Sequence, residues 1–405
     1  MAQHPVLIIG AGIGGLSLAN GLQKLGIPFI VLERDASLGT RPQGYRVRLG
    51  ADGAEALKHN LTPEIWDMFE RTCPASPGQE STHMDAQTAE VTAPPAQFGQ
   101  GRPPGHSYTV DRTTVRHVMA AGLKPESIKY GKVFKKYELT PDGVTAHFED
   151  GSSFSGSLLV GAEGVHSRVR KQYLPKLIPL NCEGNFIFGK TPLTEEFKAA
   201  FPPQALERMT LINDKVQASS LRLLLEAIRF KRDPILNLPF ELPEDYVYWV
   251  LIAHRDLFTR LGMCKGRFER FNGPEAAELS IELTSHWDTS LKALFKHQNT
   301  AQASTIQVVS MHPNMPEWTP SRVTLIGDAA HVMPPTGAAG ASCAFLDAAS
   351  LSKEIEAKGV AVEAVAAYEN EMRSRMGGFI TKSLMGAKHL YNLRDVNELE
   401  PATNV

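Results

Sequence analysis

The sequence predicts an α/β fold in which a mostly parallel, doubly wound sheet is interleaved with a second, mixed β-sheet domain and followed by C-terminal helices. Three observations lead to this prediction. A short apolar run, Val6 to Ile9, leads straight into a glycine-rich turn. Apolar strands without another such turn fill the middle of the chain, and a further apolar strand ending in Gly327-Asp328 returns to the first sheet.

The first turn carries a dinucleotide-binding fingerprint. Gly10, Gly12 and Gly15 occupy the three glycine positions of a GxGxxG motif, and a helix with leucines on one face follows. Such glycines let the chain turn tightly and bring its backbone against a diphosphate at the helix N-terminus. A second apolar strand, Phe29 to Leu32, ends at Glu33, where a carboxylate accepts hydrogen bonds from the adenosine ribose. The pattern predicts a Rossmann-like domain.

Composition excludes several classes of protein. The chain has 405 residues, 42% hydrophobic and 21% charged, with a formal charge of −2, so two or three domains and no nucleic-acid partner are expected. The cysteines Cys73, Cys182, Cys264 and Cys343 form no CxxC pair, which argues against a disulfide framework and a metal site. Since no leader or transmembrane run is recognised, we expect a cytoplasmic monomer or weak dimer.

After Glu33 a polar loop leads to an expected strand over residues 44–49. Its alternation places Arg46 and Arg48 on one face. Either arginine could neutralise the diphosphate or be solvated at a strand edge, and the sequence favours neither. Residues 50–71 have the apolar spacing of a single helix.

Composition then changes. Residues 73–105 are rich in Pro, Ser, Gly and Thr, and we interpret them as an excursion with a strand near residues 80–93. The chain returns at 108–112, where another helix begins. Alternation over 133–148 predicts a hairpin, and the apolar run 158–161 predicts a buried strand.

The middle of the chain predicts a second sheet. Apolar strands are expected over residues 185–189, 221–230 and 246–253, and the last has apolar side chains on both faces. Such a sheet must be covered on both sides. Helices cover one face, and either helices or a bound apolar molecule covers the other.

The C-terminal region begins with the strand at 322–328. A Pro- and Gly-rich loop follows, then a helix from about Ala341, a second helix over 361–384, and a polar tail after Asn392 that we expect to be loose. The expected domain boundaries are 1–72, 106–172 and 321–360 for the nucleotide-binding domain, 73–105 and 173–320 for the substrate domain, and 361–405 for the C-terminal segment.

Three separated motifs, Gly10 to Gly15, Gly161 to Arg170 and Gly327-Asp328 with its sequel, together resemble one family. They are similar to the single-component FAD-dependent aromatic hydroxylases, the class A flavoprotein monooxygenases, and most of all to the branch of salicylate hydroxylase, tetracycline-inactivating monooxygenase and fungal secondary-metabolite oxygenases. The resemblance implies the fold of para-hydroxybenzoate hydroxylase, FAD as cofactor, NADPH or NADH as co-substrate, and O2.

The resemblance also implies which residues bind the cofactor. Arg112 matches an arginine near the flavin ribityl and pyrophosphate chain, Asp328 the acid that binds the ribityl hydroxyls, and Pro334 begins the loop around the isoalloxazine. The full implied set is Gly10, Gly12, Gly14, Gly15, Glu33, Arg34, Arg46, Arg112, Asp328, Pro334, Gly340 and Ala341.

The sequence departs from the family at three positions. Glu163 stands for the Asp of an Asp-Gly motif that contacts FAD and NADPH, Ser342 for an Asn, and Ala339 for a Gln. Lengthening the acid by one methylene moves a hydrogen-bond acceptor, so nicotinamide binding is the step most affected. His331 could act as a base, but the resemblance favours a structural residue beside the flavin, and we expect no catalytic side chain.

The expected function is therefore an FAD-dependent monooxygenase acting on a bulky aromatic, alkaloid or polyketide-like substrate. The resemblance implies oxygen transfer from a flavin C4a-hydroperoxide, giving hydroxylation or epoxidation. Because the sequence has one dinucleotide fingerprint, the nicotinamide would visit the flavin transiently. The alternatives are an FAD-dependent dehydrogenase or reductase without oxygen transfer, and a degenerate flavin-binding module.

Overall fold

The computed structural model describes residues 4–39, 46–75, 78, 80–97, 107–216, 221–233, 235, 237–260, 271–403 and 405. Parts of three sequence predictions lie outside the described residues: Cys264, the loop and strand residues 40–45, and residues 98–105 of the excursion.

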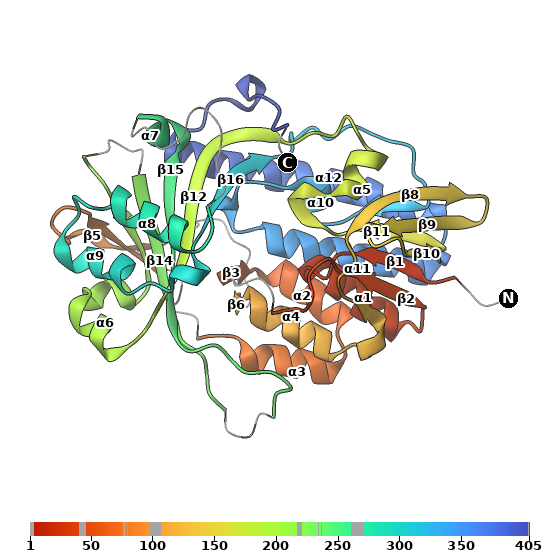
Figure 1. Cartoon of the computed structure of the whole chain (residues 1–405), viewed down its shortest axis with the longest axis horizontal. Coiled ribbons are helices and arrows are strands. Elements are labelled where there is room, and N and C mark those ends of the chain that lie inside the picture. The colour runs from red at the N-terminus through yellow and green to blue at the C-terminus, as the bar shows by residue number, and fades with distance from the viewer. Residues whose placement is uncertain are drawn as a thin grey trace.

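The described chain forms two lobes (Figure 1). The strands are β1 (Val6–Ile9), β2 (Phe29–Leu32), β3 (Arg46–Leu49), β4 (Glu80–Asp85), β5 (Val91–Gln97), β6 (Tyr108–Asp111), β7 (Ile128–Lys129), β8 (Phe134–Thr140), β9 (Gly143–Phe148), β10 (Ser153–Gly156), β11 (Leu158–Gly161), β12 (Leu180–Pro192), β13 (Met209–Asn213), β14 (Leu221–Ile228), β15 (Tyr246–His254), β16 (Ser304–Ser310) and β17 (Val323–Leu325). The α-helices are α1 (Ile13–Lys24), α2 (Ala51–Asn60), α3 (Pro63–Thr72), α4 (Arg112–Ala121), α5 (Arg168–Tyr173), α6 (Glu195–Ala200), α7 (Arg255–Arg260), α8 (Pro274–Leu283), α9 (Thr289–Lys296), α10 (Asp328–His331), α11 (Gly340–Lys358) and α12 (Val362–Tyr391).

The nucleotide-binding lobe, which we define as the five-stranded sheet with α1, α2, α4 and α11, is built on a parallel sheet of order β17-β11-β1-β2-β7. The last residue of β1, Ile9, pairs with Gly161 on one side and Leu32 on the other. The strands therefore end at one edge, and the segments beginning at Gly10, Glu33 and Ala162 meet there. This edge is where α/β sheets bind their ligands.

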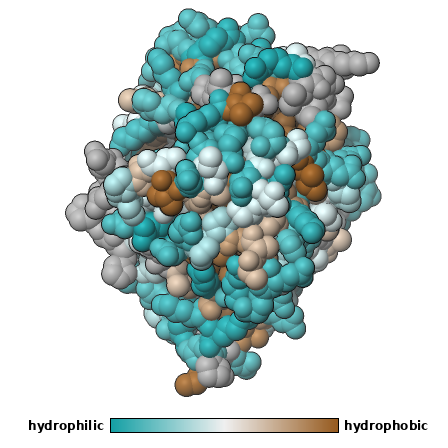
Figure 2. Space-filling view, turned by 90° about the vertical axis from the view of Figure 1, so that its left-hand side faces the viewer, coloured by the Kyte–Doolittle hydropathy of each residue, from teal (hydrophilic) through white to brown (hydrophobic). Residues whose placement is uncertain are grey.

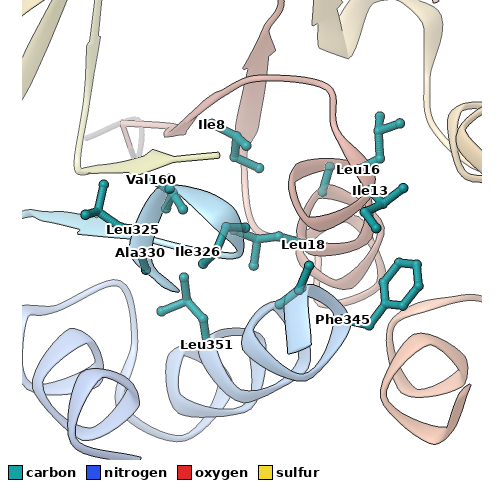
Figure 3. Close-up of a cluster of buried hydrophobic side chains, with 14 of the residues drawn as sticks. Ile8, Ile13, Leu16, Leu18, Val160, Leu325, Ile326, Ala330, Phe345 and Leu351 are labelled. Atoms are coloured by element: carbon teal, nitrogen blue, oxygen red, sulfur yellow. The ribbon is translucent and has the colours of Figure 1, made fainter. Parts of the chain in front are cut away.

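The core of this lobe explains why distant segments converge. Figure 3 shows Ile8, Val160 and Leu325 from three neighbouring strands packed with side chains of α1 and α11. Each of these three residues is almost fully buried, and the first two helical leucines of α1, Leu16 and Leu18, are fully buried. The third motif of the sequence is thus held against the first by apolar packing.

The substrate lobe, which we define as the seven-stranded sheet with α6, α8 and α9, has the strand order β16-β12-β15-β14-β13-β4-β5. Strands β4 and β5, from the predicted excursion, pair at its edge, so a segment early in the chain joins strands that come much later. The two-stranded ribbon β3–β6 lies between the lobes (Figure 1).

The two faces of the seven-stranded sheet are covered differently. Val247, Trp249 and Leu251 point into a core shared with α6, α8 and α9, where Trp249 lies edge-on to Phe295 at 5.1 Å. The opposite face, which carries Tyr248, packs in part against the end of α12. The predicted two-faced burial is confirmed, and helical cover accounts for much of both faces.

The outward surface of the substrate lobe is mostly hydrophilic, with isolated hydrophobic side chains rather than one continuous patch (Figure 2). Isolated exposed apolar residues are ordinary on protein surfaces. Among the described residues, no helix has both the length and the apolar character needed to cross a membrane.

The prediction of a single helix over residues 50–71 is wrong, because the structure has two helices there. Helix α2 ends at Asn60 and α3 begins at Pro63. Thr62 accepts a hydrogen bond from the Ile65 amide, and Pro63 occupies the first turn, where its missing N–H leaves no donor unsatisfied. The apolar stripe continues across the break, which is why periodicity alone did not reveal it.

Two predictions for the C-terminus are also wrong: that the last helix ends at residue 384, and that the tail is loose. Helix α12 continues to Tyr391, and the tail residues Leu393 and Leu399 are buried in the same apolar cluster. Backbone amides complete the attachment: Asn181 donates to the Glu400 carbonyl at 2.8 Å, and Ala402 donates to the Pro179 carbonyl at 2.7 Å. Two apolar side chains in a polar tail are enough to anchor it.

Candidate cofactor-binding site

The glycines of the turn after β1 are needed for two different reasons. A Cβ at Gly10, whose φ is +109°, would lie 2.7 Å from the Ala162 carbonyl oxygen, and a Cβ at Gly15 would lie 2.2 Å from the Gly10 carbonyl oxygen. A Cβ at Gly12 would meet nothing closer than 3.7 Å. The fold itself therefore requires Gly10 and Gly15, whereas the space beside Gly12 is left open to a ligand.

The start of α1 lies at this open space. Gly12 is the N-cap of α1 and has no side chain to cap the helix, so it supplies no side-chain acceptor for the first amides of the helix. A helix N-terminus with free N–H groups attracts an anion such as a diphosphate. Gly14 lies inside the helix, where a Cβ would be 3.4 Å from the side chain of Ile326, the residue after β17, and 3.5 Å from Ala344 of α11, so the helix packs closely against both.

A cleft brings together the segments that follow three parallel strands. It is lined by Ile9, Gly10, Gly12, Leu32, Glu33, Arg34, Asp35, Arg112, Thr113, Arg116, Lys132, Val133, Phe134, Ala162, Glu163, Gly164, His166 and Arg168. Five of the residues named from the sequence, Gly10, Gly12, Glu33, Arg34 and Arg112, are among them.

Glu33 is held rigidly at the cleft. It is 5% exposed, and its two carboxylate oxygens accept hydrogen bonds from the Ala11 amide at 2.7 Å and the Asp35 amide at 2.9 Å. Each carboxylate oxygen can accept a further bond. Glu33 therefore fixes the glycine turn and keeps capacity to accept ribose hydroxyls.

Two arginines one turn apart on α4 reach the same cleft. Arg116 donates to the Ala11 carbonyl at 3.0 Å and to the Leu38 carbonyl at 3.2 Å, so it clamps the turn. Arg112 is exposed, and with the described residues it makes no hydrogen bond or ion pair. Arg116 is not among the residues predicted from the sequence, although its i, i+4 spacing from Arg112 could have indicated it. The unpartnered Arg112 fits a pyrophosphate ligand.

The third motif lies beside the first but does not line this cleft. Asp328 is exposed, and a Cβ at Gly340 would be 3.9 Å from its carboxylate, so the two predicted residues are neighbours. Pro334 is buried and Ala341 is partly exposed. A Cβ at Gly14 would lie 3.5 Å from Ala344, which joins α11 to the glycine turn. The geometry suits one extended ligand that runs from the cleft toward Asp328.

His331 does not line the cleft; it lies beside the buried carboxylate of Asp347. It is 1% exposed and forms a hydrogen-bonded ion pair with Asp347, whose carboxylate also accepts the Gly327 amide at 2.8 Å and Arg375 at 2.8 Å. Burial opposes the imidazolium, but the Asp347 carboxylate outweighs it and raises the pKa of His331. This set of contacts fixes the Gly327-Asp328 turn, in line with the expected structural role.

Arg46 requires a correction. It does not line the cleft and is not solvated; its guanidinium pairs with the Glu226 carboxylate, and Arg48 pairs with the same carboxylate at 3.1 Å. The arginine side chains are each 8% exposed. The solvated alternative is wrong for both residues because their partner is a buried acid on a distant strand, which spacing along the sequence cannot reveal.

Glu163 turns inward from the cleft wall. Its carboxylate accepts the Ser167 hydroxyl, the Arg168 amide at 3.0 Å and the Val169 amide at 3.2 Å. Burial raises its pKa in spite of these donors. The longer acid thus caps the turn before α5.

The parallel sheet, the open glycine turn and the acid at the end of β2 define a dinucleotide-binding α/β protein. Residues 3–179 and 254–380 match the family described as FAD binding domain, and the chain belongs to that family. The FAD cofactor and the resemblance to flavoprotein monooxygenases are thereby confirmed. The open space at Gly12 leaves room for the FAD diphosphate, and Arg112, which pairs with none of the described residues, offers it a cation.

Known proteins are similar over almost the whole chain. The dual O-methyltransferase/FAD-dependent monooxygenase elcB of Phaeosphaeria nodorum is 39% identical over 98% of this chain, and the chain spans 47% of that protein, about half its length. The FAD-dependent monooxygenase thnD of Trichoderma harzianum is 26% identical, with 98% of this chain and 95% of that protein covered. The solved structure of Klebsiella pneumoniae HpxO with FAD and uric acid has a TM-score of 0.73 at 20% identity and covers 96% of this chain and 90% of its own, which shows a shared fold.

Proposed function

We propose that the chain is an FAD-dependent monooxygenase that consumes NADPH or NADH and inserts one oxygen atom from O2 into a bulky aromatic or polyketide-like substrate, by hydroxylation or epoxidation. The observation that carries the proposal is the cleft in which the open turn at Gly12 lies together with Arg112, an exposed arginine that pairs with no residue in the described part of the chain. The monooxygenase relatives that match the whole chain support oxygen transfer as the reaction.

Residues of the nucleotide-binding lobe would hold the cofactor. The amides at the start of α1 and the Arg112 guanidinium would bind the diphosphate, and Glu33 would accept the ribose hydroxyls. Asp328, exposed beside Gly340, would accept the ribityl hydroxyls. When bound, FAD supplies the redox chemistry and the activation of dioxygen.

The chain must supply a dry wall for the substrate. On the face of the seven-stranded sheet that carries Tyr248 and packs in part against the end of α12, Phe188, Val250 and Leu224 lie in one row across neighbouring strands. Phe188 and Val250 are buried and Leu224 is partly exposed. An apolar row excludes water from a reactive site and orients an apolar substrate by contact. We infer that this row lies against the substrate.

The mode of nicotinamide binding that we propose is based on the single dinucleotide fingerprint of the chain. The turn at Gly12 serves FAD, so NADPH or NADH would reach the flavin transiently from the substrate side. Glu163 supports a transient nicotinamide, because its carboxylate already accepts hydrogen bonds from Ser167, Arg168 and Val169 and is therefore engaged within its own loop. We further expect a cytoplasmic protein that is a monomer or weak dimer. Light scattering of the purified protein would check the oligomeric state, and fractionation of the cells would check the location.

The test follows NADPH consumption and hydrogen peroxide release across a panel of aromatic, alkaloid and polyketide compounds under 18O2. A compound that accelerates NADPH oxidation, suppresses peroxide and gains one 18O atom supports the proposal. An oxidised product without 18O would instead indicate a dehydrogenase. A yellow protein that never oxidises NADPH with any compound would indicate a flavin-binding module.

A further inference from the structure

One buried acid touches both lobes at once. Asp111, the last residue of β6, is 1% exposed, and its Oδ1 accepts the Thr114 amide at 2.9 Å as the N-cap of α4. Its Oδ2 accepts Lys190 Nζ at 3.0 Å and the Tyr246 hydroxyl at 2.7 Å, and both donors stand on the seven-stranded sheet. Arg112 is the first residue of α4. The helix start that presents the cofactor arginine is therefore joined to the substrate lobe through one side chain.

The two donors on the substrate lobe, Lys190 and Tyr246, also contact each other. Lys190 Nζ lies 4.1 Å from the centre of the Tyr246 ring, so the two hold each other as well as Asp111. Lys190 is 7% exposed and Tyr246 is 4% exposed. Burial and the Asp111 carboxylate raise the pKa of the Tyr246 phenol, which keeps it a hydrogen-bond donor.

A second set of ion pairs restricts the same ribbon. Arg46, which pairs with Asp111 across the β3–β6 ladder, and Arg48 both bind Glu226 on β14. The ribbon is thus held by side chains from three strands of the seven-stranded sheet, β12, β14 and β15, and of these contacts it is the one to Asp111 that leads directly into α4. A buried carboxylate that loses a cation must take a proton or seek other donors. If Lys190 were removed, the bond from Asp111 to the Thr114 amide would be the one at risk.

We propose that Lys190 and Tyr246 are positioning residues for the cofactor: acting through Asp111, they set the place of Arg112 at the diphosphate. The proposal rests on FAD binding by the cleft and not on the oxygen transfer proposed above. It means that the substrate lobe contributes to FAD affinity without lining the cleft in which the diphosphate would lie.

The experiment titrates the flavin-free full chain with FAD and follows the quenching of flavin fluorescence. Lys190→Met keeps the length of the side chain and removes its charge, and Tyr246→Phe removes one hydroxyl. We expect Lys190→Met to raise the Kd for FAD about tenfold and Tyr246→Phe to raise it less, as for members of one hydrogen-bonded network. Lys190→Arg, which keeps a cation, should recover part of the loss.

The control is Thr191→Val on the same strand. Thr191 is buried, faces the other side of the sheet and donates to the Leu294 carbonyl at 2.7 Å. We expect this variant to lower the thermal midpoint while leaving the Kd for FAD unchanged. A Kd that rises equally in Thr191→Val and Lys190→Met would overturn the proposal, since general destabilisation would then explain both.

A double-mutant cycle decides whether the effect passes through the arginine. In an Arg112→Gln background, Lys190→Met should change the Kd for FAD by less than twofold, because the group that it positions is gone. A full tenfold effect in that background, or no effect of Lys190→Met and Tyr246→Phe in the natural chain, refutes the inference. Because the readout is FAD binding, absence of NADPH oxidation would contradict only the proposed reaction and would leave the positioning role of Lys190 and Tyr246 unaffected.

Discussion

At the scale of single residues, the glycine turn makes a distinction that substitution can test. Gly12→Val should give protein with a normal far-UV circular dichroism spectrum but no yellow colour, because the fold has room for a side chain there and the diphosphate does not. Absorbance near the flavin bands measures the loss.

Gly15→Ala is the matched control for the same turn. Its Cβ would lie 2.2 Å from the Gly10 carbonyl oxygen, so this smaller change should destabilise the fold itself and reduce the yield of folded protein. Recovery of Gly12→Val with full flavin content would show that the turn does not hold the diphosphate.

Asp328 gives a second prediction for the cofactor. The residue is exposed, and it makes no hydrogen bond or ion pair with the part of the chain that the structure describes. Asp328→Ala should therefore weaken FAD retention during gel filtration while the circular dichroism spectrum stays unchanged. If the spectrum and the flavin were lost together, Asp328 would be a structural residue.

The His331 and Asp347 pair predicts a pH dependence of stability. Although burial opposes both charges, the pair raises the pKa of His331 above 6.5, and Asp347, also helped by Arg375, has its pKa lowered below 3.8. The raised His pKa contributes stability below the unfolded value that is lost as pH rises through the folded one. The lowered Asp pKa contributes stability above its unfolded value that is lost in acid.

His331→Gln should therefore lower the free energy of unfolding most between pH 3.8 and 6.5. The loss should be about 3 kcal/mol, as for breaking a buried ion pair, and shrink as the solution becomes alkaline. Urea unfolding at about pH 6 and about pH 9 measures it. A loss that is equal at both, or larger at the higher pH, would contradict a charged pair.

At the scale of elements, the extension of α12 to Tyr391 is one of the features that the sequence did not predict. Tyr391→Ala should cost about 3 kcal/mol or more, because Tyr391 is 1% exposed and lies edge-on to Phe186 with ring centres 5.4 Å apart. Met385→Ala on the same helix is the control, since Met385 is 57% exposed, and it should change stability by less than about 0.5 kcal/mol. Urea unfolding compares the two variants.

Most strands and helices could be predicted because their apolar patterns are local. The hairpin of β8 and β9, the strand β11 and the helix α4 appear where alternation and spacing indicated them. The ends of elements could not be predicted as well, because partners elsewhere decide them. The tail is anchored through Leu393, Leu399 and a backbone bond to Asn181, none of which forms a local pattern.

The candidate site divides in the same way. Gly10, Gly12 and Glu33 could be placed from the sequence because the strand, turn, helix and second strand are consecutive. The partners of Arg46 and Asp111 could not, since Glu226 comes 180 positions after Arg46 and Lys190 comes 79 positions after Asp111, both on another sheet. Resemblance to a family identifies residues at the cofactor, and only the structure identifies what holds them.

At the scale of the whole molecule, the buried charges between the lobes predict cooperative unfolding. Separating the lobes would break the ion pairs of Glu226 with Arg46 and Arg48 and of Asp111 with Lys190, and unfolding one lobe alone would leave its partner's charges unpaired, which is costly. We expect one calorimetric transition, with loss of far-UV signal and flavin release at the same temperature. Two resolved transitions would show that the lobes unfold separately.

The two oxygens of Asp111 have a consequence for protein engineering. Because one oxygen caps α4 and the other is satisfied from a different sheet, this flavin module is not self-sufficient at that corner. A chimera that transplants the module onto a foreign catalytic platform would need an amine and a phenol supplied at the same two points. Without them, the graft would carry an orphaned acid beneath its coenzyme.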